Sequence, residues 1–277
     1  MSEKNEYRAI FKVTSILGGV QVFNILIIII RSKIIAILLG PMGMGIAGLF
    51  NTTLELFFTV SGLGIDKSAV KEISFVNKKV GIGRTLNKKI NLIRRLSWYV
   101  ALLGSVLMII FSSSLSKLVF DSESYIFAFV WLSVALFFKQ LMQVNLSILQ
   151  GLRTISNLAK ANMLGSIVSL LVTIPLYYYW RIEAIVPAII ISYISSFVVS
   201  YYFQSRHVIA MIKPWSFNIR NDFKNGKETI KLGMLLSFTG IITTATTYIF
   251  QIYLREVSSL EIVGLYLAGM AILNYYV

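Results

Sequence analysis

The chain has 277 residues but no cysteine, a single histidine and only four prolines. Without cysteine it has no disulfide framework, no thiolate nucleophile and no cysteine-bound metal. The histidine, His207, lies in a basic segment and has no partner there for a metal site or a catalytic triad. The sequence therefore predicts no metal, no cofactor and no catalytic residue of these kinds.

Nucleotide-binding motifs are also missing. The chain contains no G-x-x-x-x-G-K-[ST], so it does not hydrolyse ATP through a P-loop. Gly43–Gly48 matches G-x-G-x-x-G, but that fingerprint requires a preceding strand and a βαβ unit. Here it joins two apolar runs, and we expect its glycines to serve a tight turn after Gly40-Pro41.

Acidic residues are scarce: 12 Asp and Glu stand against 26 Lys and Arg, a formal net charge of +14. In a soluble protein this excess would suggest a nucleic-acid partner. The chain is, however, 56% hydrophobic and only 14% charged, which is outside the range of ordinary soluble domains. We therefore predict an all-α polytopic membrane protein and no nucleic-acid partner.

Long apolar runs predict the membrane helices, because a hydrocarbon core about 30 Å thick needs roughly 20 apolar residues per helix. The predicted spans are 14–39, 46–65, 96–114, 125–148, 160–180, 184–203, 232–254 and a last run from Glu261. A basic loop at 66–95 separates the second span from the third. The last run stops after roughly 16 residues, without the basic anchor expected at a helix end, so we expect about eight helices and a truncated chain.

The basic residues predict the orientation. Twenty of the 26 fall in four segments: the N-terminus, 66–95, 150–160 and 204–231. The connections between spans that alternate with these segments, and so lie on the other side of the membrane, contain only Lys117, Arg181 and Arg255. Since Lys and Arg accumulate in cytoplasmic loops, we place the N-terminus and all four segments in the cytoplasm. The same segments are expected to attract anionic membrane lipids.

Polar residues inside the spans supply the candidate site. The second span carries Glu55, its only acid, on a stripe with Asn51, and the first carries Arg31 on a broad sector with Asn24. The fourth carries Lys139 in line with Gln143. Charges inside a bilayer are costly and usually pair or face a wet cavity, so we expect a cationic cavity in which Glu55 pairs with Arg31 or Lys139.

Two readings of these stripes stay open. Lys33 lies about 200° around the helix from Arg31, and its long stem can reach outward to the interface. The seventh span carries a stripe of small and polar residues ending at Gln251: Gly233, Ser237, Gly240, Thr244, Thr247 and Gln251. Such a stripe indicates tight helix packing at least as readily as a pore lining.

Several stretches resemble the lipid-linked oligosaccharide flippases, the O-antigen translocases, of the multidrug/oligosaccharidyl-lipid/polysaccharide exporter superfamily. The stretches that carry the resemblance are Lys33–Gly45, Gly62–Lys67, Leu149–Arg153, Gly165–Ile167, Lys213–Trp215 and Ser258–Tyr266. They occur in order along essentially the whole chain.

The resemblance implies a bacterial inner-membrane protein with two lobes around a central cavity. In that arrangement 1–205 is a six-helix lobe, 206–231 a basic cytoplasmic linker, and 232–277 the start of a second lobe. The implied function is translocation of a polyprenyl-pyrophosphate-linked glycan for O-antigen or polysaccharide synthesis. A polysaccharide polymerase and the export machinery would be its protein partners.

With that substrate, the candidate residues take specific roles. Arg31 would contact the pyrophosphate, because a guanidinium offers several donors to an anion. Lys139 would add charge, and Gln143 and Gln251 would bind sugar hydroxyls. Glu55 would couple transport to a proton gradient by becoming protonated.

Three other functions remain open. One is a multidrug or cation exporter of the same superfamily, although an Arg31-containing cavity disfavours cationic substrates. Another is an inactive fragment. The third is a membrane-embedded polysaccharide polymerase, for which the longest basic loop offers only Asp66 and Glu72 among nine cations.

Overall fold

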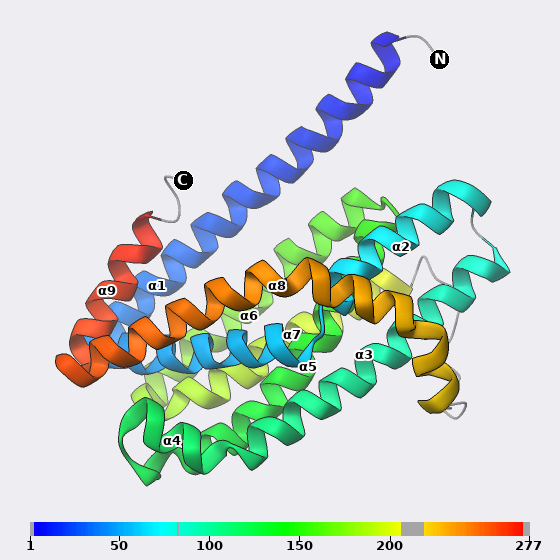
Figure 1. Ribbon diagram of the computed structural model, residues 1–277. Coiled ribbons are helices and arrows are strands. Elements are labelled where there is room, and N and C mark those ends of the chain that lie inside the picture. The colour runs from blue at the N-terminus through cyan, green and yellow to red at the C-terminus, as the bar shows by residue number, and fades with distance from the viewer. Residues whose placement is uncertain (1–2, 82, 206–218, 274–277) are drawn as a thin grey trace.

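The computed structural model describes residues 3–81, 83–205 and 219–273, and all regular structure in these ranges is helical (Figure 1). The helices, in chain order, are α1 (Glu3–Ser61), α2 (Ile65–Val80), α3 (Arg84–Ile110), α4 (Ser112–Phe120), α5 (Ile126–Gly151), α6 (Ile155–Trp180), α7 (Ile185–Ser205), α8 (Ile219–Val257) and α9 (Leu260–Leu273). Two 3-10 turns, η1 (Glu123–Tyr125) and η2 (Arg181–Ala184), precede α5 and α7.

Helix α1 doubles back on itself at Gly40. There φ is 69° and ψ is −176°, a combination that only glycine adopts without strain. Pro41 follows directly, and its missing N–H is tolerated because it opens the second half of the helix. The predicted boundary between the first two spans is thereby confirmed, and the connection between them is a sharp bend rather than a loop.

Five apolar stretches of the described chain are long enough to cross a membrane: Gly18–Ser61, Arg84–Ile110, Glu123–Gly151, Ile155–Ser205 and Ile219–Val257. Two of them contain a reversal, at Gly40 and at η2. Five stretches with two reversals correspond to seven membrane-length helices, and the shorter apolar helix Leu260–Met270 follows. The protein is therefore an all-α polytopic membrane protein, as the apolar runs predicted.

The predicted basic loop at 66–95 is wrong as a description of structure, because most of it is helical. Ile65, Ala69 and Ile73 recur at four-residue steps and are buried, whereas Lys67 and Lys71 between them are exposed. This amphipathic pattern makes α2 a helix that packs on α5 and α8. Residues 84–95 then form the first turns of α3, which starts twelve residues before the predicted span.

The predicted linker at 206–231 also differs from the structure where it is described. Residues 219–231 are the beginning of α8, which continues without a break through the predicted span at 232–254. The remainder of that linker, 206–218, lies outside the described residues, and so does the Lys213–Trp215 stretch of the resemblance. At the other end of the bundle, the third span ends at Ile110 rather than 114, and the separate helix α4 follows it.

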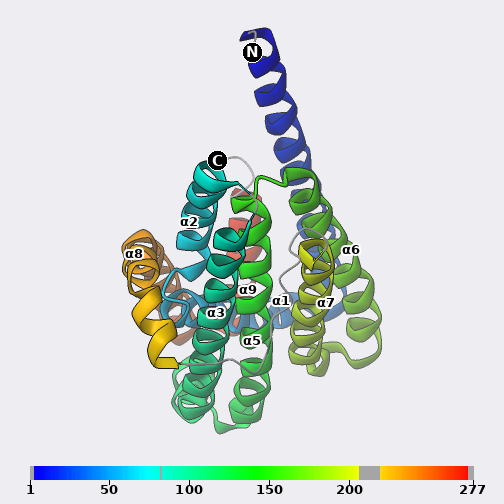
Figure 2. The same cartoon turned by 90° about the vertical axis from the view of Figure 1, so that its right-hand side faces the viewer.

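The helices form a bundle in which α5 is central. Helix α5 packs against α3 on one side and α7 on the other, and α7 packs against α6. Figure 2 shows α2 and α8 on one side of α3 and α5, with α6 and α7 on the other. The second half of α1 contributes Phe50 to the core, where its ring lies 5.0 Å from Phe120 and 5.2 Å from Phe129 between centroids.

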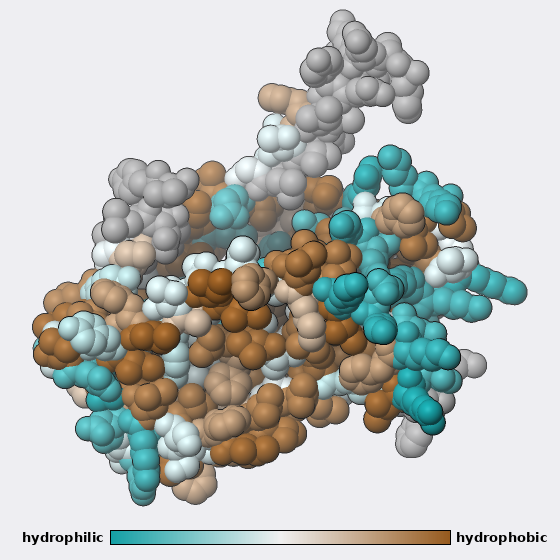
Figure 3. All heavy atoms as spheres, in the orientation of Figure 1, coloured by the Kyte–Doolittle hydropathy of each residue, from teal (hydrophilic) through white to brown (hydrophobic). Residues whose placement is uncertain are grey.

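The two ends of the bundle are polar and the band between them is apolar. Figure 3 shows hydrophilic residues gathered where α2 and the first turns of α3 and α8 meet, and a hydrophobic belt beside them. We call that end the basic end; it carries the described cations of 67–95 and 220–231. Most of the described positive charges thus lie at one end of the molecule, as the alternating pattern of basic connections predicted, whereas Lys117, Arg181 and Arg255 lie in α4, η2 and the last turn of α8.

Helix α9 lies against α1 through glycines. A Cβ at Gly45 would come within 2.1 Å of the Leu260 carbonyl oxygen, and one at Gly264 within 2.0 Å of the Pro41 oxygen. Small residues allow such close backbone approach between membrane helices. The expectation that Gly43–Gly48 forms a turn is therefore wrong: these glycines are inside α1, and two of them, Gly45 and Gly48, form its contact with α9.

We expect Gly45→Ala to lower the melting temperature of the purified protein in detergent. The added methyl group would meet backbone, which cannot yield without moving α9, and overpacking of this kind costs about 1–3 kcal/mol. Gly19→Ala is the matched control, since nothing lies within 4 Å of a Cβ there. Equal melting temperatures for the two variants would contradict the close contact between α1 and α9.

The small-residue stripe of α8 also serves helix packing. A Cβ at Gly233 would lie 2.4 Å from the Leu63 oxygen, so α8 touches the turn between α1 and α2. Ser237 is buried beside Gly64 at the same contact. The sequence left open whether this stripe packs against another helix or lines a pore. The half of the stripe around Gly233 and Ser237 packs closely against its neighbour.

Candidate functional site

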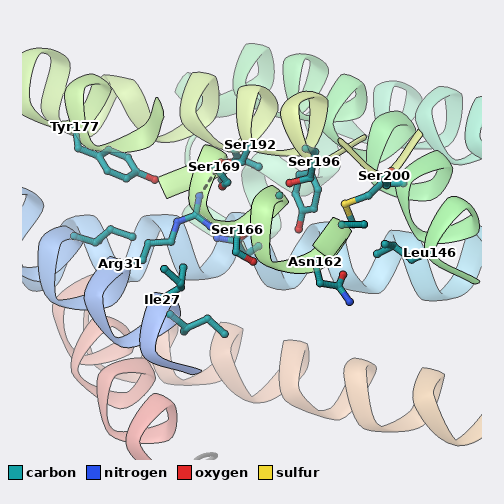
Figure 4. Close-up of a pocket in the computed structure, with 18 residues that line it drawn as sticks. Ile27, Arg31, Leu146, Asn162, Ser166, Ser169, Tyr177, Ser192, Ser196 and Ser200 are labelled. Carbon is teal, nitrogen blue, oxygen red and sulfur yellow. Dashed lines mark hydrogen bonds between the residues drawn. The ribbon is translucent and has the colours of Figure 1, made fainter. Parts of the chain in front are cut away.

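A cavity of about 400 Å³ lies between the first half of α1 and helices α5, α6 and α7 (Figure 4). It runs along α7 from Ile189 to Ser200, which at 1.5 Å per residue is about 16 Å within the membrane-spanning part. Helices α6 and α7, on which the sequence offered no candidate residue, supply much of its wall.

Arg31 is the charged residue that lines the cavity. Its Nη2 donates a hydrogen bond of 2.7 Å to Ser192 Oγ, across the space between α1 and α7. Figure 4 shows the guanidinium directed from α1 toward Ser192 and Ser169. Among the described residues Arg31 forms no ion pair, so its positive charge is uncompensated and suits an anionic ligand.

Hydroxyl groups form one wall of the cavity. Ser192, Ser196 and Ser200 follow one another at four-residue steps on α7, and Ser166 and Ser169 face them from α6. The remaining polar lining residues are Asn51, Asn162, Tyr177 and Tyr193. Only Asn51 was a sequence candidate, yet the signal is present in the sequence, because a four-residue step places side chains on one helix face.

Apolar side chains form a second wall of the cavity. Ile27, Ile28 and Ile35 of α1 line it together with Met142 and Leu146 of α5. A ligand in this cavity therefore meets a fixed cation, a row of hydroxyl groups and an apolar surface. This combination matches an amphiphile with an anionic, hydroxyl-rich head and a hydrocarbon tail.

Glu55 pairs with Lys139, which decides between the two partners that the sequence allowed. The Lys139 side chain is 10% exposed and that of Glu55 is 49% exposed. Lys139 Nζ also lies 5.0 Å from the centroid of the Phe58 ring and 5.4 Å from that of Tyr193. Tyr193 lines the cavity as well, so this ion pair is next to the cavity wall although Lys139 does not line it.

The other predicted residues divide into two groups. Asn51 lines the cavity, and Asn24 accepts a hydrogen bond of 3.2 Å from Ser166, which lines it too. Gln143, Gln251 and Lys33 are not part of the lining. Lys33 is exposed, in keeping with an outward-reaching side chain.

The predicted role of Gln251 in binding sugar is not supported by its position. Its side chain is buried on α8, and its Oε1 has no hydrogen-bond partner in the described part of the chain. The half of the stripe around Gly233 and Ser237 is a packing face, whereas Thr247, one turn before Gln251, is exposed. Hydroxyl groups of α6 and α7 line the cavity, and Gln143 and Gln251 do not.

Acidic residues at the basic end serve as structural partners. Glu72 Oε2 lies 2.8 Å from Lys89 Nζ and accepts a hydrogen bond of 2.7 Å from Thr229. Asp222 is buried and receives Arg95 at 2.8 Å and the Tyr99 hydroxyl at 3.0 Å. These contacts join the start of α8 to α2 and α3, and they engage Glu72, one of the two acids that a polymerase active site in this segment would need.

Asp66, the other acid, is expected to make stability depend on pH. It stands in the first turn of α2, outside the apolar stretches, and burial raises its pKa despite the adjacent Lys67. A raised folded-state pKa stabilises the fold below the unfolded pKa, and this contribution is lost as pH rises through the folded value. Asp66→Asn should therefore melt higher than wild type at pH 7, with the difference shrinking toward pH 4. A constant difference across this range would contradict the assignment.

Comparisons of the chain with protein-family models, curated proteins and solved structures find no match. No group of three or more potential metal ligands occurs among the described residues. Fold and site thus define the class: an all-α polytopic membrane protein with a cationic, hydroxyl-lined cavity inside its span.

Proposed function

We propose that the protein is a flippase, which moves a polyprenyl-pyrophosphate-linked oligosaccharide across the bacterial inner membrane for O-antigen or polysaccharide synthesis. The observation that carries this proposal is the uncompensated Arg31 in a cavity with one hydroxyl wall and one aliphatic wall. The resemblance of the sequence to O-antigen translocases points to the same substrate.

The three surfaces of the cavity correspond to the three parts of such a lipid. The pyrophosphate is a concentrated anion, and Arg31 retains guanidinium N–H donors beyond the one given to Ser192. The serines of α6 and α7 offer hydrogen bonds to the first sugar. The isoleucines of α1 offer a surface to the prenyl chain. About 400 Å³ is within the range of small-molecule sites, so this cavity holds the head of the lipid and not a whole glycan.

The basic end is cytoplasmic in this proposal, and the N-terminus lies on the same side. Lys and Arg collect on the inner face of membrane proteins, and the anionic inner leaflet attracts them further. The substrate is made at that face, so the same charges would gather it before translocation.

A cation exporter is the nearest rival, and the sign of the cavity separates the two. An organic cation would have to approach Arg31 without a compensating acid in the lining, and like charges repel in a low-dielectric site. Glu55, the acid within the spans that the sequence offered as a partner of Arg31, pairs with Lys139 instead. The cavity therefore favours an anionic head group.

Binding to the purified chain tests the proposal directly. We expect a short-chain prenyl-pyrophosphate disaccharide to bind, the corresponding prenyl alcohol to bind weakly, and an organic cation such as ethidium not to compete. Binding of ethidium together with no binding of the pyrophosphate lipid would contradict the proposal and favour the exporter. In cells, expression in a strain lacking its O-antigen flippase should restore surface polysaccharide.

A further inference from the structure

A second cavity, of about 470 Å³, lies at the basic end between α2, α3 and the first turns of α8. Its polar lining residues are Thr85, Lys88, Lys89, Asn91, Arg95 and Asn225, and Val76 and Leu92 form an apolar side. It shares no lining residue with the Arg31 cavity. We call it the α2–α3–α8 cavity.

We propose that the α2–α3–α8 cavity binds the phosphate-bearing headgroup of an anionic membrane lipid. The inference does not depend on which molecule the protein transports. It rests on three observations: cations held in place around one cavity, hydrogen-bond donors that remain free on them, and the height of the cavity at the edge of the apolar belt.

Two of the cations are fixed by carboxylates behind them. Arg95 donates through Nε and Nη2 to the two oxygens of Asp222, and Lys89 contacts Glu72 and Thr229. Their side chains are only 24% and 22% exposed. They therefore lose little conformational freedom when a ligand binds, unlike lysines on an open surface.

Arg95 and Lys89 retain hydrogen-bond donors that their carboxylate and hydroxyl partners do not use. A guanidinium has five N–H donors and an ammonium has three. Arg95 uses two on Asp222, and Lys89 uses two on Glu72 and Thr229, which leaves three on Arg95 and one on Lys89. Lys88 is exposed and forms no ion pair among the described residues.

The charge balance favours an anion. Lys88, Lys89 and Arg95 contribute three positive charges, and Glu72 and Asp222 contribute two negative ones, so the group carries a net charge of +1. Neither carboxylate lines the cavity. The amides of Asn91 and Asn225 and the hydroxyl of Thr85 add neutral donors around the same space, as a phosphate with several oxygens requires.

The position of the cavity at the edge of the apolar belt indicates that the phosphate belongs to a lipid. Arg95 is the last cation before the uncharged run of α3 that begins at Leu96, and Trp98 and Tyr99 follow within one turn. Aromatic residues of this kind mark headgroup depth. A lipid phosphate at that depth can reach Lys88 and Arg95 while its glycerol backbone meets Val76 and Leu92.

Native mass spectrometry of the full chain in a neutral detergent tests the proposal, with phosphatidylglycerol, phosphatidylcholine and inorganic phosphate as probes. We expect phosphatidylglycerol to bind, and Lys88→Gln to weaken that binding about fivefold, as loss of one cation near a phosphate implies. Asn225→Asp, which places a negative charge in the cavity, should weaken it further.

Matched controls distinguish a site from general attraction. Lys78→Gln removes an exposed lysine about 200° around α2 from Val76, and Gln150→Glu adds an acid at the basic end outside the cavity. Both should bind phosphatidylglycerol as wild type does. Equal weakening by Lys78→Gln and Lys88→Gln would overturn the proposal, and so would binding of inorganic phosphate that depends on Lys88 and displaces the lipid.

Discussion

Glu55→Ala is expected to destabilise the protein by about 3 kcal/mol, because it leaves the Lys139 ammonium inside the membrane span without its carboxylate partner. The Lys139 side chain is 10% exposed, and Glu55 is the carboxylate paired with it. Removing one partner of a buried ion pair costs about 3–5 kcal/mol, since the remaining charge stays desolvated. We take the lower value because Glu55 itself is half-exposed, which leaves a path for partial solvation.

The reverse substitution should cost less. Lys139→Ala leaves a carboxylate whose side chain is 49% exposed, so the charge that remains is less buried than Lys139 is in Glu55→Ala. The double variant Glu55→Gln with Lys139→Met should return close to wild type. Replacing a buried ion pair by neutral residues of similar size is often neutral or stabilising, unlike breaking the pair.

The melting temperatures of these variants in detergent, at one pH and salt concentration, order the effects. We expect the loss to be largest for Glu55→Ala, smaller for Lys139→Ala and least for the double variant. If the double variant melts as low as Glu55→Ala, the two residues do not act as a pair. Phe58 and Tyr193 flank Lys139, and they remain in all three variants, so differences report on the charges.

Arg31→Ala is expected to have the second large effect, which is on ligand binding. Loss of the cation should weaken binding of a prenyl-pyrophosphate disaccharide by about 2 kcal/mol, which is about thirtyfold in Kd, the value of a charged hydrogen-bonding contact. Arg31→Lys should fall between alanine and wild type, because it keeps the charge and loses the planar set of donors. Translocation in the complementation assay should fall with binding.

Lys33→Ala is the matched control for Arg31. It removes a positive charge two residues along the same helix, from an exposed position outside the cavity lining. Its binding should equal that of wild type. If Lys33→Ala and Arg31→Ala weaken binding equally, the effect comes from the general charge of α1 and the Arg31 cavity is not the binding site.

The membrane helices were predictable from the sequence because they depend on local properties. Apolar runs long enough to cross a bilayer are visible without any knowledge of their neighbours. The Gly40-Pro41 pair marked the end of the first span for a similar reason, since its backbone preferences belong to those two residues. The segment 66–95 was missed because α2 is amphipathic rather than apolar, so a test for apolar length passes over it.

The candidate site was predictable only in part. Arg31 and Asn51 could be placed on polar helix faces from their spacing, and both line the cavity. The serines of α7 have an equally regular spacing, but α7 has no charged residue that drew attention to them. Gln251 shared a polar stripe with glycines, and from one helix alone a packing face and a lining face have the same pattern.

By itself the sequence determined that this protein crosses a membrane as helices, that its positive charges gather at one end, and that Arg31, Glu55 and Lys139 are charges within the span. Hydrophobicity, charge and helical period are properties of one segment at a time, so no fold is needed to read them. Only the tertiary structure decided that Lys139 pairs with Glu55 and that Arg31, in a hydroxyl-lined cavity, has no ion pair among the described residues. That choice depends on how the helices rotate and approach one another, and contacts such as Gly45 with Leu260 and Gly233 with Leu63 set those positions between residues far apart in the chain.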